Sequence, residues 1–214
     1  MRIKGTSISS LLSFLEAEYG GSRTREFVGT LPIDLRKRCE GLVLASAFYP
    51  VEEMEAVARK ARQHFNGDAT FYERSGAHYA TVGLGGVHQA LLARPTPLDF
   101  IRALERSWSQ FVDEGGMDGN VVGDGKVRVI FEQVRGSDVR CPRVTGFLGR
   151  ALEMAEGKKV RVIKAACTEK GAQFCEWGVS WDAVLSPPSM SQTTSIKRLI
   201  PVPETIPAPS SPRT

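Results

Sequence analysis

Hydrophobic residues recur every three or four positions through the first half of the chain, which is the spacing of amphipathic helices. This pattern predicts helices over the residue ranges 8–19, 23–28, 33–39, 50–65, 76–91 and 97–112. Thr96 followed by Pro97 is typical of a helix start. Gly76, Gly83 and Gly86 fall inside the fifth helix, where each costs about 1 kcal/mol relative to alanine. That helix therefore needs close tertiary packing to persist.

The second half of the chain changes to alternating apolar and polar positions, which is the pattern of strands. It predicts a strand over 126–135, a helix that Pro142 opens and Gly157 ends, and two strands over 158–167 and 172–181. Helices followed by strands of this kind indicate an α+β fold. We expect an N-terminal helical part, then an antiparallel sheet with one packed helix and a closing C-terminal hairpin.

The closing hairpin is expected to turn at Gly171 and to place Cys167 opposite Cys175. In that register one face is apolar, as required for a sheet that covers a core on one side. The residues assigned to this face are Ile163, Ala165, Cys167, Cys175, Trp177 and Val179. From Ser186 the chain becomes rich in proline, serine and threonine, which is typical of disordered segments. We therefore expect one domain over 1–185 and a disordered tail over 186–214.

Composition narrows the classes of function. Of the 214 residues 42% are hydrophobic and 24% charged, and the net charge of +4 is spread along the chain, so neither nucleic-acid binding nor a membrane span is predicted. The N-terminus lacks the features of an export signal. Four cysteines are too few for a disulfide scaffold in a chain of this length. A cytoplasmic protein with reduced thiols is expected.

Catalytic and metal motifs receive little support. The chain has no G-x-S-x-G, H-E-x-x-H or phosphate-loop motif, so no enzyme is predicted. Cys167 and Cys175 are the candidates for a metal or redox site. Cys39 and Cys141 could complete a set of four ligands, but their spacing matches no known metal-binding motif. We favour the interpretation that the two hairpin cysteines are small buried hydrophobic residues. We expect neither a metal nor a cofactor.

Several segments carry a family resemblance. The arrangement C-x3-G-x3-C-x-W, preceded by GFLGRALEMAEGKKVRV, resembles the C-terminal half of vinyl-reductase-type and TRAPP-like domains, which share a superfamily with haem-nitric-oxide-binding domains. The segments KGTSISSLLSFLEAEYG, LPIDLRKRCEGLVLASAFYPVEEM and LGGVHQALLARPTPLDFIRALERSWSQFVDEGG resemble a bacterial family called domain of unknown function 2378. The likeness covers residues 4–181, and it implies no particular activity.

The superfamily resemblance implies either a ligand pocket between helices and sheet or a surface for dimerisation. Haem-binding relatives place a histidine on a helix and a Tyr-x-Ser-x-Arg motif beyond it. This chain has His64, His78 and His88 but lacks that motif, so haem is not expected.

Two functional hypotheses follow. In the first, the chain is a signalling module that binds a small apolar ligand, and the pocket residues are Tyr79, Val82, Val87, Leu91, Trp108, Phe131, Phe147 and Trp177. In the second, it is a protein-interaction adaptor that forms a homodimer or binds a protein partner, with the proline-rich tail as a docking segment. The alternative interpretation, which these residues taken by themselves favour, is that they fill an ordinary core.

Overall fold

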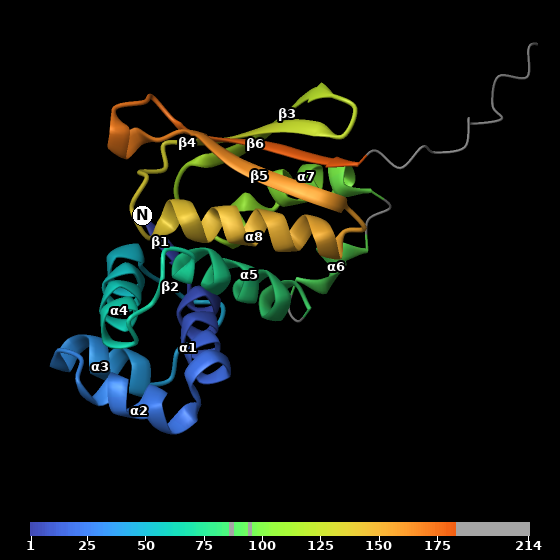
Figure 1. The fold of residues 1–214 in the computed structure, drawn as a ribbon. Coiled ribbons are helices and arrows are strands. Elements are labelled where there is room, and N and C mark those ends of the chain that lie inside the picture. The colour runs from blue at the N-terminus through green and yellow to red at the C-terminus, as the bar shows by residue number, and fades with distance from the viewer. Residues whose placement is uncertain (86–87, 94–95, 183–214) are drawn as a thin grey trace, which may run out of the picture. The chain divides into compact units, whose positions relative to one another are not determined.

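The computed structural model of the chain describes residues 1–85, 88–93 and 96–182 (Figure 1). The chain divides into two units, Met1–Ala183 and Val184–Thr214. Every element below belongs to the first unit. The predicted tail over 186–214 lies outside the described residues, so its disorder and the boundary at 185 stay predictions.

The N-terminal part is helical, as the sequence predicts. It consists of α1 (Gly5–Tyr19), α2 (Gly21–Gly29), α3 (Ile33–Glu40) and α4 (Val51–His64). Their apolar faces share one core, whose largest fully buried members are Ile8, Leu11, Phe14, Leu15 and Phe27. Two short strands, β1 (Arg2–Lys4) and β2 (Phe48–Pro50), pair antiparallel beside these helices. The sequence does not predict them, because three residues are too few to show a period of two.

The glycine-rich helix is shorter than predicted. Helix α5 covers Phe71–Leu84, and a separate short helix α6 covers Gln89–Leu92, so the single helix expected over 76–91 is wrong. The last turn of α5 ends at Gly85, whose N–H donates to the carbonyl of Thr81. Helix α7 (Pro97–Arg106) begins as predicted, with the Thr96 hydroxyl accepting from the backbone N–H of Asp99. It ends at Arg106, so the predicted extension to 112 is wrong, and a 3-10 turn covers Trp108–Gln110 instead.

The C-terminal part is a four-stranded antiparallel sheet with the order β3-β4-β6-β5. Its strands are β3 (Gly116–Gly123), β4 (Lys126–Glu132), β5 (Lys158–Ala166) and β6 (Cys175–Asp182). Helix α8 (Arg140–Met154) lies between this sheet and α5 (Figure 1). Strand β3 is missing from the sequence prediction because its glycines and asparagine hide the alternation. The predicted α+β class, with a packed helix and a closing hairpin, is confirmed.

The closing hairpin is paired, and its predicted register holds next to the turn, where Ala166 lies opposite Glu176. Further along β5 the register is wrong by one residue, since Ile163 lies opposite Gly178 instead of Val179. The cause is an irregularity between Lys164 and Ala166, which adds one residue to β5 relative to β6 and moves the residues before it to the other face. As a result Ile163 is 68% exposed, while Cys175, Trp177 and Val179 of β6 are buried as predicted. Trp177, only 1% exposed, seals the core between sheet and α8.

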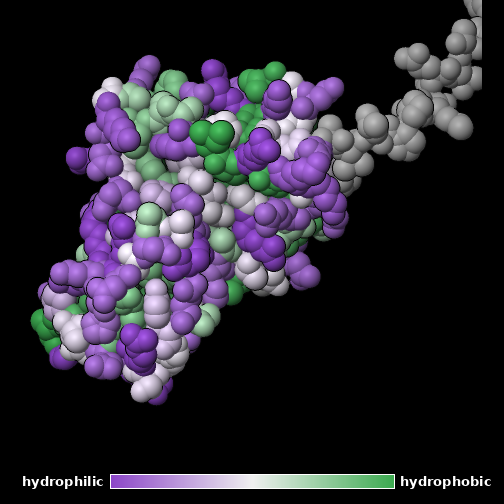
Figure 2. Space-filling model, viewed as in Figure 1, coloured by the Kyte–Doolittle hydropathy of each residue, from purple (hydrophilic) through white to green (hydrophobic). Residues whose placement is uncertain are grey.

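The surface of the described unit is mainly hydrophilic, with separate hydrophobic spots (Figure 2). Exposed large apolar residues include Leu42, Leu44 and Ile33 near α3, and Ile163 on β5. Single exposed apolar residues of this kind are common on monomeric proteins. Among the described residues, none of the helices has the length and apolar character that crossing a bilayer requires.

Candidate functional site

An apolar cavity of about 120 Å³ lies where the N-terminal helices meet α5, α8 and β4. One wall comes from β1, α1 and α4, and the opposite wall from α5, α8 and β4. We call it the apolar cavity. Its lining residues are Met1, Ile3, Ser7, Val51, Met54, Gly76, Tyr79, Leu104, Trp108, Phe111, Val112, Phe131, Val134, Arg140, Arg143, Val144, Phe147 and Leu148.

Two glycines set the wall formed by α5 and α8. A Cβ atom on Gly76 would overlap the carbonyl oxygen of Arg143, and one on Gly146 would overlap that of Glu73. The two helix backbones therefore touch, which only glycine permits. This close crossing brings the rings of Tyr79 and Phe147 to a centroid distance of 5.6 Å at the cavity wall.

Polar groups at the apolar cavity come mainly from the first turn of α8. The Arg143 side chain is buried, and its Nη1 donates to the Ser75 hydroxyl at 2.8 Å. Burial lowers the pKa of Arg143 to about 10, and the nearby Tyr79 and Glu55 oppose the shift. Burial also raises the pKa of Tyr79, whose hydroxyl lies 3.3 Å from that of Thr6. The phenol is thus neutral and the guanidinium charged at pH 7.

Arg140 is held by a carboxylate beside the cavity. Its Nη2 donates to Oε1 of Glu55 at 2.7 Å, and its Nη1 donates to the carbonyl of Arg135. The same Oε1 accepts from the Ser137 hydroxyl at 2.7 Å, while Oε2 accepts from Arg59 at 3.3 Å. Glu55 is therefore fully engaged by neighbours on its own side of the cavity.

Four of the eight predicted ligand-binding residues line the apolar cavity. They are Tyr79, Trp108, Phe131 and Phe147. The rings of Trp108 and Phe131 lie 4.7 Å apart between centroids and continue the aromatic wall that Tyr79 and Phe147 begin. Whether these residues bind a ligand stays a prediction.

The other four predicted residues are elsewhere or outside the described part. Val82 is 42% exposed on the outer face of α5, so it does not line the cavity. Leu91 and Trp177 are buried in the core between α8 and the sheet, where the Trp177 Nε1 donates to the Thr145 hydroxyl at 2.9 Å. Val87 lies outside the described residues.

The cavity residues that the sequence reasoning misses are chiefly Arg140, Arg143 and Met54. A signal for Arg143 does exist. It lies four residues before Phe147 and eight before Ala151, on the apolar stripe of the predicted helix. A charged residue on a buried stripe is unusual and indicates either a partner or a ligand.

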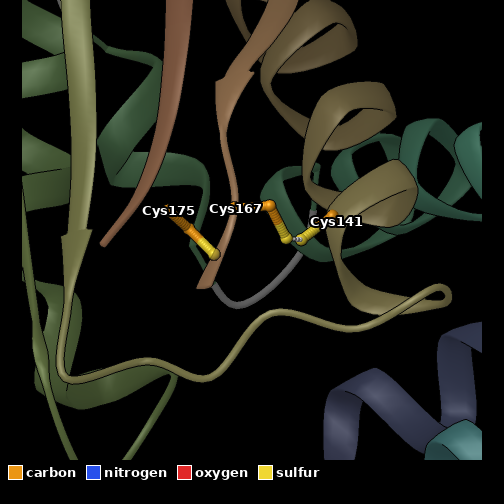
Figure 3. Close-up of side chains that lie close together, drawn as sticks. All are labelled: Cys141, Cys167 and Cys175. Carbon is orange, nitrogen blue, oxygen red and sulfur yellow. Dashed lines mark hydrogen bonds between the residues drawn. The ribbon is translucent and has the colours of Figure 1, made fainter. Parts of the chain in front are cut away.

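A second site lies at the other side of the same turn. The sulfur atoms of Cys141, Cys167 and Cys175 all lie within 4.8 Å of one another, and we call these residues the thiol cluster. Figure 3 shows Cys141 and Cys167 pointing toward each other, with their sulfur atoms 3.6 Å apart. Gly136 borders the cluster, because a Cβ there would lie 2.6 Å from the sulfur of Cys167 and 3.0 Å from that of Cys175. The cluster is thus a small cradle closed by a glycine.

The three thiols are not equivalent. Burial raises the pKa of Cys141 to about 12. Burial also opposes ionisation of Cys175, but the backbone and hydroxyl of Thr168 and the ammonium of Lys164 outweigh it, so the pKa of Cys175 lies below its ordinary value. The Lys164 Nζ lies 3.2 Å from the centroid of the Trp177 ring. The cluster therefore contains one thiol that ionises readily next to one that does not.

Haem does not fit the apolar cavity. Its 120 Å³ is below the roughly 300–1,000 Å³ of pockets for drug-sized ligands. No histidine or cysteine is among the described residues that line it. His64 packs beside Phe65, His78 contacts the Ser13 hydroxyl at 3.0 Å, and His88 packs beside Phe111.

Comparison with known proteins gives likeness in structure only. No family model matches the chain, and no curated protein matches it. Among solved structures it is similar to an H-NOX protein of S. oneidensis in the Fe(II)NO ligation state, with 12% identity, a TM-score of 0.67, and coverage of 83% of this chain and 98% of the other. It is also similar to an Fe(II) unliganded H-NOX protein from K. algicida, with 12% identity, a TM-score of 0.65, and coverage of 86% and 98%.

A third similar structure is a mutant H-NOX of T. tengcongensis, with 10% identity, a TM-score of 0.67, and coverage of 86% of this chain and 100% of the other. These identities are too low to transfer a ligand or a role. Nearly the whole length of each of the three H-NOX chains is nevertheless matched. The chain has the same fold as these H-NOX proteins.

Proposed function

We propose that this chain is a non-catalytic signalling domain that binds a small apolar ligand in the apolar cavity. The observation that carries the proposal is the aromatic wall of Tyr79, Phe147, Trp108 and Phe131 around a partly enclosed space of about 120 Å³. An engineered apolar cavity of about 150 Å³ accepts benzene, so a single aromatic ring is the appropriate scale. Membership of the family called domain of unknown function 2378, with its vinyl-reductase-type relatives, is part of this proposal and rests on the sequence segments alone.

The fold supports this function without supplying the ligand. H-NOX proteins in the comparison include one in the Fe(II)NO ligation state, and this chain combines the same fold with an apolar cavity. A pocket between packed helices can report occupancy through small shifts of those helices. A ligand of benzene size would contact α1, α4, α5 and α8 together.

The test is a pair of matched substitutions with small aromatic probes. Val144 lines the cavity and Val82 does not, so Val144→Phe fills the space while Val82→Phe adds the same ring outside it. Binding of toluene, benzamide and benzoate is measured by ligand-observed NMR and calorimetry. We expect binding of at least one probe by the original chain and by Val82→Phe, weakened at least about tenfold by Val144→Phe. Absence of binding for all three probes would contradict the proposal.

We propose a second role for the thiol cluster, which is to hold a thiophilic cation such as Zn²⁺. The specific observation is that three buried sulfur atoms converge within 4.8 Å around a glycine that leaves them room. Three thiolates with an open fourth position are a known zinc arrangement, and Lys164 nearby favours the ionised thiols. The sequence alone places only Cys167 and Cys175 together, and the structure adds Cys141.

The metal role is tested by zinc content and by titration with a chromophoric chelator. Cys141→Ser removes one ligand from the cluster, while Cys39→Ser changes a half-buried thiol on α3 that is not part of it. We expect one zinc per chain in the original protein and in Cys39→Ser, and less than a tenth of that in Cys141→Ser. A protein that takes up no zinc, or that keeps it after Cys141→Ser, would show that the thiols are only core residues.

The alternative of an interaction adaptor stays a prediction. Its strongest support is the exposed group of Ile33, Leu42 and Leu44 in and after α3. Native mass spectrometry separates the two roles, because a ligand-binding domain gives a monomer mass that increases with the probe. A dimer mass without any bound small molecule would favour the adaptor.

A further inference from the structure

The apolar cavity contains a buried cation without a counter-charge. Arg143 is 5% exposed, and its only hydrogen-bond acceptor among the described residues is the neutral hydroxyl of Ser75, 2.8 Å from Nη1. Its Nη2 is buried and has no partner within the described part of the chain. Arg143 is one of the residues that line the apolar cavity.

The nearest acidic group is committed to other residues. Glu55 accepts hydrogen bonds from Arg140, Ser137 and Arg59, at distances of 2.7, 2.7 and 3.3 Å. Arg59 also pairs with Asp138, at 2.6 Å. The two carboxylates therefore face three guanidinium groups, those of Arg59, Arg140 and Arg143, and this cluster carries a net charge of about +1 before solvent is considered. A buried charge of this kind is costly unless an ion of opposite sign pairs with it.

Other candidates do not remove this excess charge. A trapped water molecule could accept from Nη2, but it would leave the charge uncompensated. Tyr79 is neutral, and its hydroxyl is already beside that of Thr6 at 3.3 Å. Arg140 contributes a second donor of the same sign, since its Nε is also buried and without a partner among the described residues. No acidic side chain is among the described residues that line the apolar cavity.

We propose that the ligand of the apolar cavity is a small aromatic or aliphatic carboxylate whose anionic group pairs with Arg143. The apolar body packs against the aromatic wall, and the carboxylate accepts from the Arg143 guanidinium, whose Nη2 has no other partner among the described residues. This inference rests on the proposed function, and it names the chemical class of the ligand. It also explains why an arginine lies on the buried stripe of α8.

The test compares three probes of similar size that differ in charge, using the full chain at pH 7. Benzoate is an anion, benzamide is its neutral counterpart, and toluene lacks the polar group. We expect benzoate to bind at least about tenfold more tightly than benzamide, since a hydrogen-bonded ion pair inside a cavity is worth more than a neutral contact. Raising the salt concentration should change this preference little, because the pair is buried.

Two substitutions on α8 locate the effect. Arg143→Met keeps an apolar side chain of similar length, and should weaken benzoate at least about tenfold while toluene binds unchanged or more tightly. Arg150→Met removes an exposed arginine of the same helix, which pairs with Glu153 at 3.3 Å, and should leave all three affinities unchanged. Arg143→Lys keeps the charge and should retain part of the preference for benzoate, which matters if Arg143→Met does not fold.

The outcomes separate the inference from the proposed function. If toluene or benzamide binds as tightly as benzoate in the original chain, the cavity binds ligands but the carboxylate inference is wrong. If Arg143→Met and Arg143→Lys both keep the full preference for benzoate, the inference is also wrong. If none of the three probes binds, the proposed function itself fails and the inference fails with it.

Discussion

The apolar cavity and the thiol cluster share the first turn of α8, but they are assembled in different ways. The cavity combines segments from Met1 to Leu148, and its walls meet through helix packing across the unit. The thiol cluster needs only one helix start and the two ends of a hairpin. The wall of the apolar cavity depends on contacts between helix backbones, whereas the glycine at the thiol cluster contacts cysteine side chains, which can move more easily. This difference determines how each should respond to the same small change.

The largest expected effect is at the backbone contact that supports the cavity. Gly76→Ala places a methyl group on the carbonyl oxygen of Arg143, and neither helix backbone can yield without opening the core. We expect a loss of about 3 kcal/mol in the free energy of unfolding, measured by urea denaturation. Gly29→Ala is the control, since a Cβ there meets nothing within 4 Å. Equal, small effects of the two substitutions would mean that α5 and α8 do not touch.

A smaller effect is expected from the corresponding change at the thiol cluster. Gly136→Ala brings a methyl group to 2.6 Å from the Cys167 sulfur, which is a side-chain atom and can move. We expect a loss of about 1 to 2 kcal/mol without metal, increasing when zinc fixes the three sulfur atoms. Gly116→Ala, with free space around it, is the control. A loss as large as that of Gly76→Ala would remove the distinction between rigid and mobile contacts.

The third prediction concerns alkaline pH. The pKa of Cys141 is raised by burial from its ordinary 9.0 to about 12, so above pH 9 the thiol ionises first in the unfolded chain. The unfolded state then binds fewer protons than the folded state, and stability falls as pH rises. Between pH 8 and 10.5, with reductant and chelator present, Cys141→Ala should lose about 1 to 2 kcal/mol less than the original chain. Identical slopes in the two proteins would contradict a buried neutral thiol at this position.

The smallest effect tests the register of the hairpin that carries Cys167 and Cys175. Ile163 is exposed on β5 and Val162 is half-buried beside the core, contrary to the face that the sequence predicts. Ile163→Thr should change the unfolding free energy by less than about 0.5 kcal/mol, while Val162→Thr should cost about 1 kcal/mol or more. Thermal melts of both variants suffice. The reverse order would restore the register expected from alternation.

The sequence predicts an element correctly where its hydrophobic residues follow one clear period, either that of a helix or that of a strand. Helices α1, α4, α7 and α8 and strands β4 and β6 follow from their spacing, and Trp177 is buried as predicted. The β5 register fails because an extra residue interrupts the ladder between Lys164 and Ala166, and local alternation does not reveal such a bulge. Strands β1, β2 and β3 are too short or too rich in glycine to show alternation.

The sites are less predictable than the fold because they depend on contacts between distant segments. Four aromatic residues of the cavity wall can be selected from the sequence, since large aromatic side chains on buried stripes are expected to meet. Arg143 stands out as a charged residue on a buried stripe, but neither it nor Met54 can be assigned to the cavity, because nothing local indicates that α4 and α8 face one space. Cys141 joins the other two thiols only through the packing of α8 on the hairpin. In each case the missing information is the position of a helix start relative to a distant strand.

The first turn of α8 places a guanidinium and a sulfur on adjoining residues, Arg140 and Cys141. A rotation of α8 about its axis would move both side chains together, because they are attached to consecutive residues of the same helix. The glycine contacts with α5 leave the helix little freedom to slide along its own length. Occupancy of the apolar cavity and the reactivity of the thiol cluster should therefore be measured together whenever either site is changed.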